Sequence, residues 1–240
     1  MEFKCILDFD GVLFDTAFEA YSVCSQHAKA NTALRGDVSF EEFLVFRSMV
    51  TDAWQYNQLY NPAKRPNAIA DLRTIVPDGE DWEFSRAFFA AREEIMAEPD
   101  WPKIMSPYEF FFLMRPLLQR YPQHFAILST RNVDSIRGTL RYFDAGDVEI
   151  FGQEDVRRYG SKVAVAKQAG WLQAESCFCV YVDDMRAHLE PFNGLTHLAL
   201  HANWGYDEGG PDSMNADQIF SIISSLTKVM IDQLSGAVDA

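Results

Sequence analysis

The chain has 240 residues, with 35 acidic against 21 basic side chains and a formal net charge of −14. This length predicts one large domain or a domain with an insertion, and a hydrophobic share of 48% is ample for a folded core. The acidic balance excludes nucleic acid and anionic membrane surfaces as expected partners, because both attract clustered lysine and arginine. An anionic substrate would need local groups that overcome this repulsive global charge.

The pattern of cysteines and the lengths of the apolar runs indicate the cellular compartment of the protein. None of the four cysteines forms a Cys-x-x-Cys pair, so the sequence predicts neither a zinc ribbon nor a thioredoxin-type site, and buried free thiols are expected. No apolar run approaches 18 residues, and the N-terminus has no signal-peptide core. We therefore expect a cytoplasmic protein. Its oligomeric state, monomer or homodimer, stays open.

The N-terminal half of the chain predicts one strand followed by helices. The apolar run Phe3–Leu7 predicts a buried strand that ends at Asp8. From residue 17 to residue 99, apolar side chains recur only at helical spacing. The signals for helices there are the capping box Ser39-Phe40-Glu41-Glu42, Pro66 with Ile69, Leu72 and Ile75, and the stripe from Trp82 to Ile95. This segment is expected to be entirely helical.

Beyond residue 100, strands alternate with helices. Ser106 and Pro107 predict the N-cap and first residue of a helix, in which Pro116 predicts a kink or an early stop. Strands are predicted at 124–128, 148–151, 177–182 and 195–201, and helices at 133–143, 161–169 and 219–234. Such alternation favours a parallel sheet. The sequence thus predicts an α/β domain, residues 1–16 and 100–240, interrupted after its first strand by a helical insert, residues 17–99.

Polar residues stand where three of the predicted strands end: Asp8 with Asp10, Ser129 with Arg131, and Asp183 with Asp184. Ligands bind at the carboxyl ends of strands in open parallel sheets, so these side chains are expected in one crevice. Four carboxylates so close together cannot all ionise without a cation. Mg²⁺ suits such a set and would allow an anionic group to enter.

Further residues are candidates for binding that anion. Ser129 offers a hydroxyl, Gly11 allows a tight turn whose N–H groups can face an anion, and Lys162 adds a positive charge at the start of a predicted helix. Arg131 and Arg47 are candidate substrate contacts. The alternative interpretation for each is an ordinary position on the protein surface.

Other residues have simpler interpretations. Asp15 is expected to be the N-cap of the first helix of the insert. Lys167 competes with Lys162 for the role of anion-binding lysine, but its expected position is on the solvent side of the helix. His197 and His201 lie four residues apart in a run typical of a strand, so they are not expected to bind zinc.

Taken together, these motifs resemble those of the haloacid dehalogenase-like hydrolase superfamily. Asp8-Phe9-Asp10-Gly11, with Asp15-Thr16 after it, is similar to the first motif, while Ser129, Lys162 and Asp183-Asp184 resemble the second, third and fourth. Trp204-Gly205-Tyr206 is similar to the usual closing stretch. The resemblance implies a Rossmann-like three-layer α/β/α core, and the helical insert stands where this superfamily has a C1-type cap.

Two departures from the family pattern concern the third and fourth motifs. Asp183 replaces the usual glycine of a Gly-Asp pair, and His188 stands where a second acid is common. Lys162 lacks the proline that often follows the motif lysine. The choice between Asp183 and Asp184 as the direct metal ligand therefore stays open, with Asp184 favoured because it aligns with the Asp of Gly-Asp.

The resemblance implies a Mg²⁺-dependent phosphomonoester hydrolase that acts on a small phosphorylated metabolite. Asp8 would be the nucleophile that becomes an aspartyl-phosphate, and Asp10 the general acid and base. Asp8, the Asp10 carbonyl and Asp184, or its rival Asp183, would hold the metal. Ser129 and Lys162, with the N–H groups at Gly11, would bind the phosphoryl group.

Other functions of the same fold stay open at this stage. A sugar-phosphate mutase would use the same motifs, and a phosphonate hydrolase would need a cap lysine, for which Lys29 and Lys64 are available. A dehalogenase is disfavoured because it lacks the second acid that Asp10 supplies. A catalytically silent binding module is a further alternative. A receiver-type signalling domain is excluded, because its paired acids follow the first strand and its phosphorylated Asp the third.

Overall fold

The computed structural model describes residues 2–64, 72, 74–173, 175–207 and 209–236. The chain divides into two compact units, one made of Met1–Asp15 with Pro107–Ala240 and the other of Thr16–Ser106. Among the described residues, no helix has the combined length and apolarity needed to cross a membrane. All four cysteines are free and buried, as predicted.

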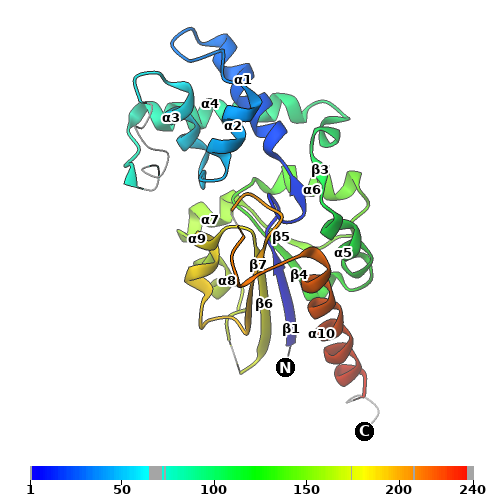
Figure 1. Cartoon of the computed structure of the whole chain (residues 1–240). Coiled ribbons are helices and arrows are strands. Elements are labelled where there is room, and N and C mark those ends of the chain that lie inside the picture. Colours follow the sequence, from blue (N-terminus) through cyan, green and yellow to red (C-terminus); the bar gives the residue numbers. More distant parts are fainter. Residues whose placement is uncertain (1, 65–71, 73, 174, 208, 237–240) are drawn as a thin grey trace. The chain divides into compact units, whose positions relative to one another are not determined.

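A six-stranded sheet forms the centre of the first unit, in the order β5-β4-β1-β6-β7-β8, and all neighbouring strands are parallel (Figure 1). Its strands are β1 (Glu2–Leu7), β4 (Phe125–Leu128), β5 (Glu149–Phe151), β6 (Cys177–Asp183), β7 (Leu198–Ala202) and β8 (Ser213–Met214). The inner strands β4 and β6 are apolar up to Asp183 at the end of β6, because both of their faces are buried. The predicted parallel α/β core is confirmed.

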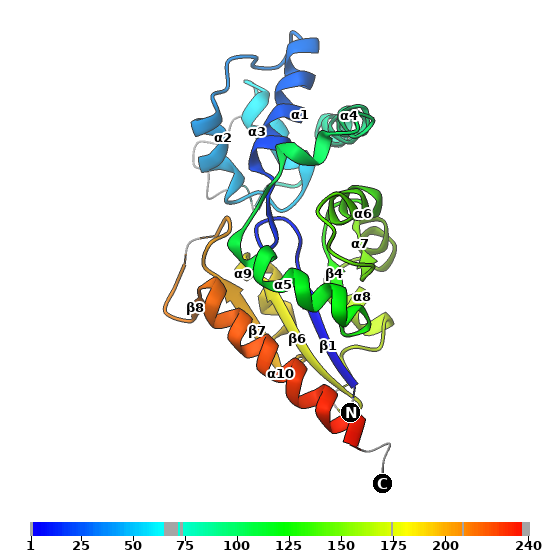
Figure 2. The ribbon, with the colours of Figure 1, turned by 90° about the vertical axis from the view of Figure 1, so that its right-hand side faces the viewer.

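Helices cover both faces of this sheet. Helices α5 (Glu109–Arg120) and α10 (Ala216–Gly236) run side by side on one face, while α8 (Lys162–Gln168) and α9 (Arg186–Leu189) cover the other (Figures 1 and 2). The remaining helices of this unit are α6 (Val133–Tyr142) and α7 (Gln153–Tyr159). On the α8 side, Val165 and Ala166 pack with Ile6 and Tyr181. The layers are therefore helix, sheet and helix.

The order of strands places the first strand at the centre. β1 lies between β4 and β6, and the chain crosses from one side of β1 to the other between β5 and β6. This is the switch in strand order at which open α/β sheets bind their ligands. Leu7 pairs with Ile127 on one side and with Val182 on the other. The residues that follow these three therefore share one edge of the sheet.

The second unit is built from helices around its own aromatic core. Its elements are α1 (Ala17–Ala30), α2 (Phe40–Arg47), α3 (Asn57–Tyr60), α4 (Gly79–Met96) and the 3₁₀ helices Ala53–Tyr56 and Trp101–Ile104. Phe43, Phe46, Phe84 and Phe88 belong to this core. The predicted cap of α2 is present, since Ser39 Oγ accepts a hydrogen bond from the Glu42 N–H at 3.1 Å.

Some predictions for this unit remain untested. The start of the helix expected from Pro66, with Ile69, lies outside the described residues, but Ile75, expected on the same helix, is described and is not helical. The interpretation of residues 17–99 as a cap over an active site also stays a prediction.

A buried ion pair joins two helices of the second unit. Arg92 on α4 donates from Nε to Glu19 Oε1 at 2.7 Å and from an Nη atom to Oε2 at 3.0 Å. Glu19 is fully buried and Arg92 is 7% exposed. The Arg92 guanidinium also lies over the ring of Phe88, 4.5 Å from its centroid. This pair therefore fixes α1 against α4 through both charge and packing.

The structure corrects the prediction for the start of α5. Ser106 and Pro107 form the short strand β3, which pairs with β2 (Phe14–Asp15), and the helix begins only at Glu109. Proline suits an edge strand as well as a first helical turn, since both tolerate a missing N–H. Pro116 does not stop the helix, which continues to Arg120.

Asp15 was expected to cap α1, and this prediction is wrong. Thr16 occupies the N-cap position without a side-chain hydrogen bond. The Asp15 carboxylate instead accepts a hydrogen bond from the Tyr206 hydroxyl at 3.2 Å. A hydrogen bond with a residue distant in sequence thus replaces the local capping bond that was predicted for Asp15.

Candidate active site at the carboxyl edge of the sheet

The polar residues that follow the three inner strands gather at one edge. Asp8 follows β1, Asp183 ends β6 and is succeeded by Asp184, and Ser129 follows β4. These side chains are buried, with exposures of 4% for Asp8, 1% for Ser129 and 0% for both Asp183 and Asp184. Buried carboxylates are rare without a compensating charge, so this edge is the strongest candidate for a functional site.

Lys162 is the cation at the centre of this group. It is the first residue of α8, whose N-cap Ser161 accepts a hydrogen bond from the Ala164 N–H at 3.1 Å. Lys162 Nζ lies 2.9 Å from Asp8 Oδ2 and 2.8 Å from Asp183 Oδ2. Burial lowers the pKa of Lys162, but the Asp183 and Asp8 carboxylates outweigh this effect and hold the pKa above its usual value.

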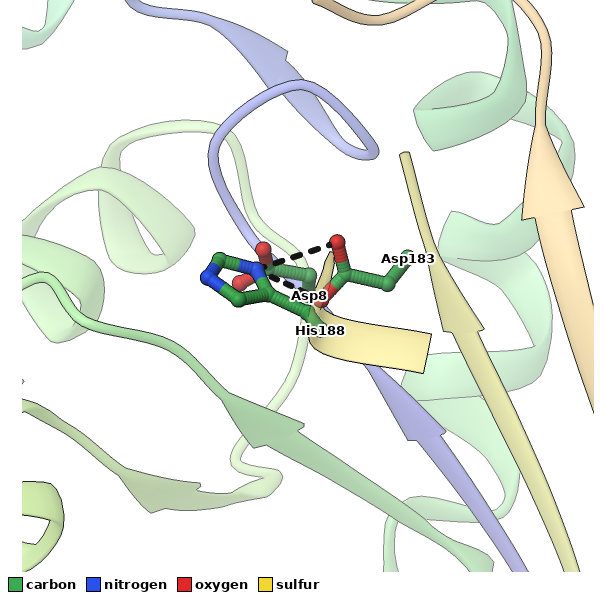
Figure 3. Close-up of side chains that lie close together, drawn as sticks. All are labelled: Asp8, Asp183 and His188. Carbon is green, nitrogen blue, oxygen red and sulfur yellow. Dashed lines mark hydrogen bonds and ion pairs between the residues drawn. The ribbon is translucent and has the colours of Figure 1, made fainter. Parts of the chain in front are cut away.

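Asp183 is the most heavily hydrogen-bonded acid of the site. Its Oδ2 accepts from Lys162 Nζ and from the Tyr181 hydroxyl, while its Oδ1 accepts from the Met185 N–H at 2.8 Å. His188 Nδ1 lies 3.3 Å from the same carboxylate (Figure 3). Burial raises the pKa of Asp183, but Lys162 and His188 outweigh it, so this pKa lies well below its usual value. Asp183 is thus a fixed anion that holds Lys162.

Asp8 has a different electrostatic environment. Burial raises the pKa of its carboxyl to about 6, against the lowering effect of Lys162. Its Oδ1 accepts a hydrogen bond from the Phe9 N–H at 2.8 Å. This carboxylate is removed from water, held in one orientation, and uses only part of its capacity to accept hydrogen bonds. Such a group is a suitable nucleophile.

Asp184 lies against two glycines. A Cβ atom added to Gly11 would lie 2.2 Å from Asp184 Oδ2, and one added to Gly205 would lie 2.3 Å from Asp184 Cβ, so neither position has space for a side chain. Gly11 also has a φ of +83°, which favours glycine. The Tyr206 N–H donates to Asp184 Oδ2 at 2.6 Å. These contacts fix the orientation of the carboxylate.

The loop at residues 204–206 also holds the loop that follows β1. Trp204 Nε1 donates to the Val12 carbonyl at 3.1 Å, and the Tyr206 hydroxyl donates to Asp15. Behind Asp184, His201 Nε2 donates to the Asp184 carbonyl at 2.9 Å, and His201 Nδ1 accepts from the Ser213 hydroxyl at 2.7 Å. His201 therefore supports the backbone of the site from β7.

Asp10 is paired with an arginine. Arg131 Nε lies 2.9 Å from Asp10 Oδ1, and an Arg131 Nη atom lies at the same distance from that oxygen. The expected alternative of a surface position for Arg131 is wrong, because only 2% of it is exposed. Its backbone N–H donates to Ser129 Oγ at 3.3 Å, so Ser129 orients the start of the Arg131 loop.

Other predicted site residues have roles that the sequence did not indicate. The Gly11 N–H donates to the Phe14 carbonyl at 2.9 Å, which corrects the expectation that it faces an anion: the tight turn closes on itself. Arg47, expected to be a substrate contact or a surface residue, is buried in the helical unit and donates to the Val50 carbonyl at 3.2 Å. Lys167 is exposed, as expected. His197 Nδ1 accepts from the Cys179 N–H at 3.2 Å.

Two members of the site were not assigned from the sequence. Tyr181 lies two residues before Asp183 on the same face of β6, and its hydroxyl also accepts from Lys162 Nζ at 3.2 Å. His188 contributes to the cluster with Asp8 and Asp183, in which one potential ligand atom from each lies within 4.8 Å of the others. Strand periodicity could have indicated Tyr181, but an aromatic residue in an apolar strand is usually core.

The donor set fits a divalent cation. Asp8, Asp10, Asp183 and Asp184 would carry four negative charges when ionised, and Lys162 and Arg131 offset only two of them. Hard oxygen ligands of this kind suit Mg²⁺. Because Asp183 is engaged by Lys162, Tyr181 and Met185, Asp8 and Asp184 are better suited than Asp183 to reach a metal.

Comparison with solved structures defines the fold family. A haloacid dehalogenase-like family hydrolase from Streptococcus pneumoniae superposes with a TM-score of 0.60 at 14% identity, over 92% of this chain and 98% of that one. A protein described as a predicted phosphoglycolate phosphatase from Haemophilus somnus gives 0.60 at 14% identity, over 94% and 98%. A predicted phosphatase from Clostridium acetobutylicum gives 0.57 at 13% identity, over 94% and 100%. The sequence matches no protein-family model and no curated protein.

The chain is therefore a three-layer α/β protein with a buried acidic site at the switch point of its sheet. More particularly, it has the fold of the haloacid dehalogenase-like hydrolases. The resemblance first seen in four short motifs is confirmed at the level of the fold, over nearly the whole chain.

Proposed function

We propose that this protein is a Mg²⁺-dependent phosphomonoester hydrolase that acts on a small phosphorylated metabolite through an aspartyl-phosphate. The observation that carries the proposal is the contact between Asp8 Oδ2 and Lys162 Nζ at 2.9 Å in a buried site. It combines an oriented carboxylate with a fixed positive charge, which are the two groups that phosphoryl transfer through a covalent intermediate requires. The folds of the compared hydrolases support the same proposal.

The reaction would take place in two steps. In the first, an oxygen of Asp8 attacks phosphorus, the bond from phosphorus to the ester oxygen breaks, and Asp10 gives its proton to the leaving oxygen. In the second, Asp10 takes a proton from water, the water oxygen attacks phosphorus, and the bond to Asp8 breaks. Inorganic phosphate and an alcohol result, and both carboxyl groups return to their starting states.

Lys162 and Ser129 would bind the phosphoryl group during transfer. Asp183 holds Lys162 in place, so the positive charge is preorganised and little energy is spent on reorienting it. Asp8, the Asp10 carbonyl and Asp184 would hold Mg²⁺, with Gly11 and Gly205 leaving the space that the Asp184 carboxylate occupies. When bound, the metal would supply positive charge that offsets the phosphate oxygens.

We also propose that the helical unit serves as a cap. Caps on such folds exclude water and bring specificity residues to the substrate. The proposed cap extends over residues 17–99, and Arg47 stays a candidate substrate contact within it. The proposed location in the cell is the cytoplasm.

The alternative of a phosphonate hydrolase receives less support. That reaction needs a lysine whose amine is neutral enough to form a Schiff base. Lys64 lies within 3.5 Å of the carboxylates of Asp78, Glu80 and Asp81. Burial lowers its pKa, but the Asp78 and Asp81 carboxylates outweigh this effect and hold the pKa above its usual value. Lys29, the other candidate, is exposed.

The proposal can be tested by phosphate release from a panel of phosphomonoesters with Mg²⁺ and with the chelator EDTA. Asp8→Asn should lower kcat by at least about 10³-fold, because no other group replaces the nucleophile. Asp134→Asn is a suitable control, since its side chain is 83% exposed on α6. Turnover that survives in Asp8→Asn, or that is insensitive to EDTA, would contradict the proposed mechanism.

A further inference from the structure

Arg131 is an unusual residue of this site because its long charged side chain is only 1% exposed. It stands between the end of β4 and the start of α6, next to the N-cap residue Asn132. Burying a guanidinium is costly unless its donors are satisfied. The partners that satisfy them therefore indicate what the residue does.

The partners of the Arg131 guanidinium include one acid and one hydroxyl. Nε and an Nη atom both contact Asp10 Oδ1 at 2.9 Å, and Nε lies 3.3 Å from Oδ2. The other Nη donates to Ser135 Oγ at 2.9 Å. Ser135 is fully buried on α6, and the guanidinium lies 5.6 Å from the ring centroid of Phe9. The arginine is thus held by a helix on one side while it binds a carboxylate on the other.

This geometry fixes the position of Asp10. A carboxylate bound by two donors of one guanidinium is restricted in both position and rotation, because the guanidinium is planar and rigid. Ser135 anchors the guanidinium to a helix, so the constraint on Asp10 extends back to the α/β core. By contrast, a substrate-binding arginine would need donors directed toward the substrate.

We propose that Arg131 is a positioning residue that holds the Asp10 carboxyl in place for proton transfer and does not itself bind the phosphate. This inference rests on the proposed function, since it needs Asp10 to be the proton donor. The inference predicts that replacing Arg131 affects catalysis only through the position of Asp10. Errors of about 1 Å in the position of a reacting group can cost about 10²-fold in rate.

The experiment compares two substrates that differ in their need for a proton. An alkyl phosphate has a poor leaving group and depends on Asp10, whereas p-nitrophenyl phosphate has a good one and depends on it little. We expect Arg131→Lys to lower kcat/KM by about 10- to 100-fold for the alkyl phosphate and by less than about 3-fold for the nitrophenyl ester. Lysine keeps the charge but lacks the planar fork.

A double-mutant cycle with Asp10→Asn provides the second readout. If Arg131 acts through Asp10, then Arg131→Lys should change the residual kcat/KM of Asp10→Asn by less than about 3-fold. Arg137→Gln is the matched control, an arginine on α6 whose side chain is 42% exposed, and it should have no effect. Thermal unfolding of each variant shows whether it is folded.

The outcomes separate the inference from the proposed function. Equal losses of kcat/KM for both substrates would overturn the inference and indicate that Arg131 binds the phosphate. Additive losses in the double-mutant cycle would overturn the inference and indicate a general structural role. If Arg131→Lys does not fold, Ser135→Ala removes only the anchor and should give the same pattern with a smaller loss. If Asp8→Asn is fully active, the proposed function itself fails, whatever the Arg131 variants show.

Discussion

The close contact between Asp184 and the glycines on either side of it leads to a prediction at the scale of single residues. Gly205→Ala would place a Cβ atom 2.3 Å from Asp184 Cβ, so the carboxylate must move. We expect the apparent affinity for Mg²⁺ and kcat/KM each to fall by at least about 10-fold, since displaced metal ligands typically cost that much. Calorimetric titration with Mg²⁺ measures the first quantity directly.

Gly209→Ala is the control for this prediction. Its added Cβ would lie 3.5 Å from the nearest atom, which is ordinary van der Waals contact. Both variants replace a glycine in the segment between β7 and β8. Equal Mg²⁺ affinities in Gly205→Ala and Gly209→Ala would show that the position of Asp184 does not matter for the metal.

Tyr181 permits a second prediction at this scale. Its hydroxyl donates to Asp183 and accepts from Lys162, and both partners are buried. Tyr181→Phe should lower the free energy of unfolding by about 1–3 kcal/mol, because it removes a hydrogen bond to a buried charged group. Denaturant unfolding measures this change, and Tyr142→Phe, at a tyrosine that is 42% exposed, should leave stability unchanged within error.

The sequence predicted some of these residues and not others for a physical reason. Asp8, Ser129 and Asp184 could be predicted because a polar residue at the end of an apolar strand must lie at the sheet edge. Arg131 was predicted as a candidate contact, but its pairing with Asp10 was not, and Tyr181 was not assigned at all, because side-chain direction depends on partners far away in sequence. Gly11 was predicted to be necessary, but for anion binding rather than for the space beside Asp184.

At the scale of elements, α8 links helix capping to the proposed catalytic site. This seven-residue helix begins with Lys162, and its N-cap is Ser161. Ser161→Ala should cost about 1 kcal/mol of stability and also lower kcat, because a frayed first turn no longer fixes Lys162. Unfolding and steady-state kinetics on the same preparation test both parts.

Ser39→Ala provides the comparison for Ser161→Ala. Ser39 caps α2 through the same kind of bond, also at 3.1 Å, but α2 carries no residue of the acidic edge. We expect a similar loss of stability with little change in kcat. A loss of kcat that is the same in both variants would indicate a general effect of lower stability instead of a specific effect on Lys162.

The sequence predicted elements well where burial is complete. β4 is apolar throughout, and β1 and β6 are mostly apolar, so their apolar runs identified all three to within one residue at each end. Short elements such as β8 and α9 were missed because they contain too few residues to show a period. The strand at Ser106-Pro107 was misassigned because its partner, β2, is distant in sequence and its residues are also typical of a helix start.

At the scale of the whole molecule, each unit has its own core, and the helical unit contains the buried pair of Glu19 and Arg92. Arg92→Met should lower the free energy of unfolding of this unit by about 3–5 kcal/mol, because Glu19 would be left as an uncompensated buried charge. The double variant Glu19→Leu/Arg92→Met should recover much of this loss. Denaturant unfolding followed by tryptophan fluorescence would measure both.

If Arg92→Met proves as stable as the wild type, the pair contributes nothing to the unit. If the double variant is no more stable than Arg92→Met, the loss comes from packing against Phe88 and not from the charge left on Glu19. The two results therefore distinguish electrostatic from packing contributions. The exposed pair Arg137–Asp134 is a suitable reference, since its removal should change stability by no more than about 1 kcal/mol.

The net charge of −14 is a poor guide to the electrostatics of the proposed active site. Four of the acids are gathered at one edge together with Lys162 and Arg131, and a divalent cation would neutralise the remaining excess. The acidity elsewhere still argues against polyanionic partners. A global charge therefore indicates which large surfaces a protein avoids, and it says little about a small anion in a buried site.

The central position of β1 has a consequence for how the protein assembles during synthesis. Cys5 on this strand pairs with Phe125 and with Val180, so the strand that precedes Asp8 has no neighbour until about half of the chain has been made, and its second neighbour follows later still. Such long-range pairings slow folding. The helices encoded between Asp15 and Ser106 can meanwhile form their own core, because domains generally fold as units in the order of their synthesis. Asp8, the proposed nucleophile, would thus be among the first residues translated and among the last to reach its final environment.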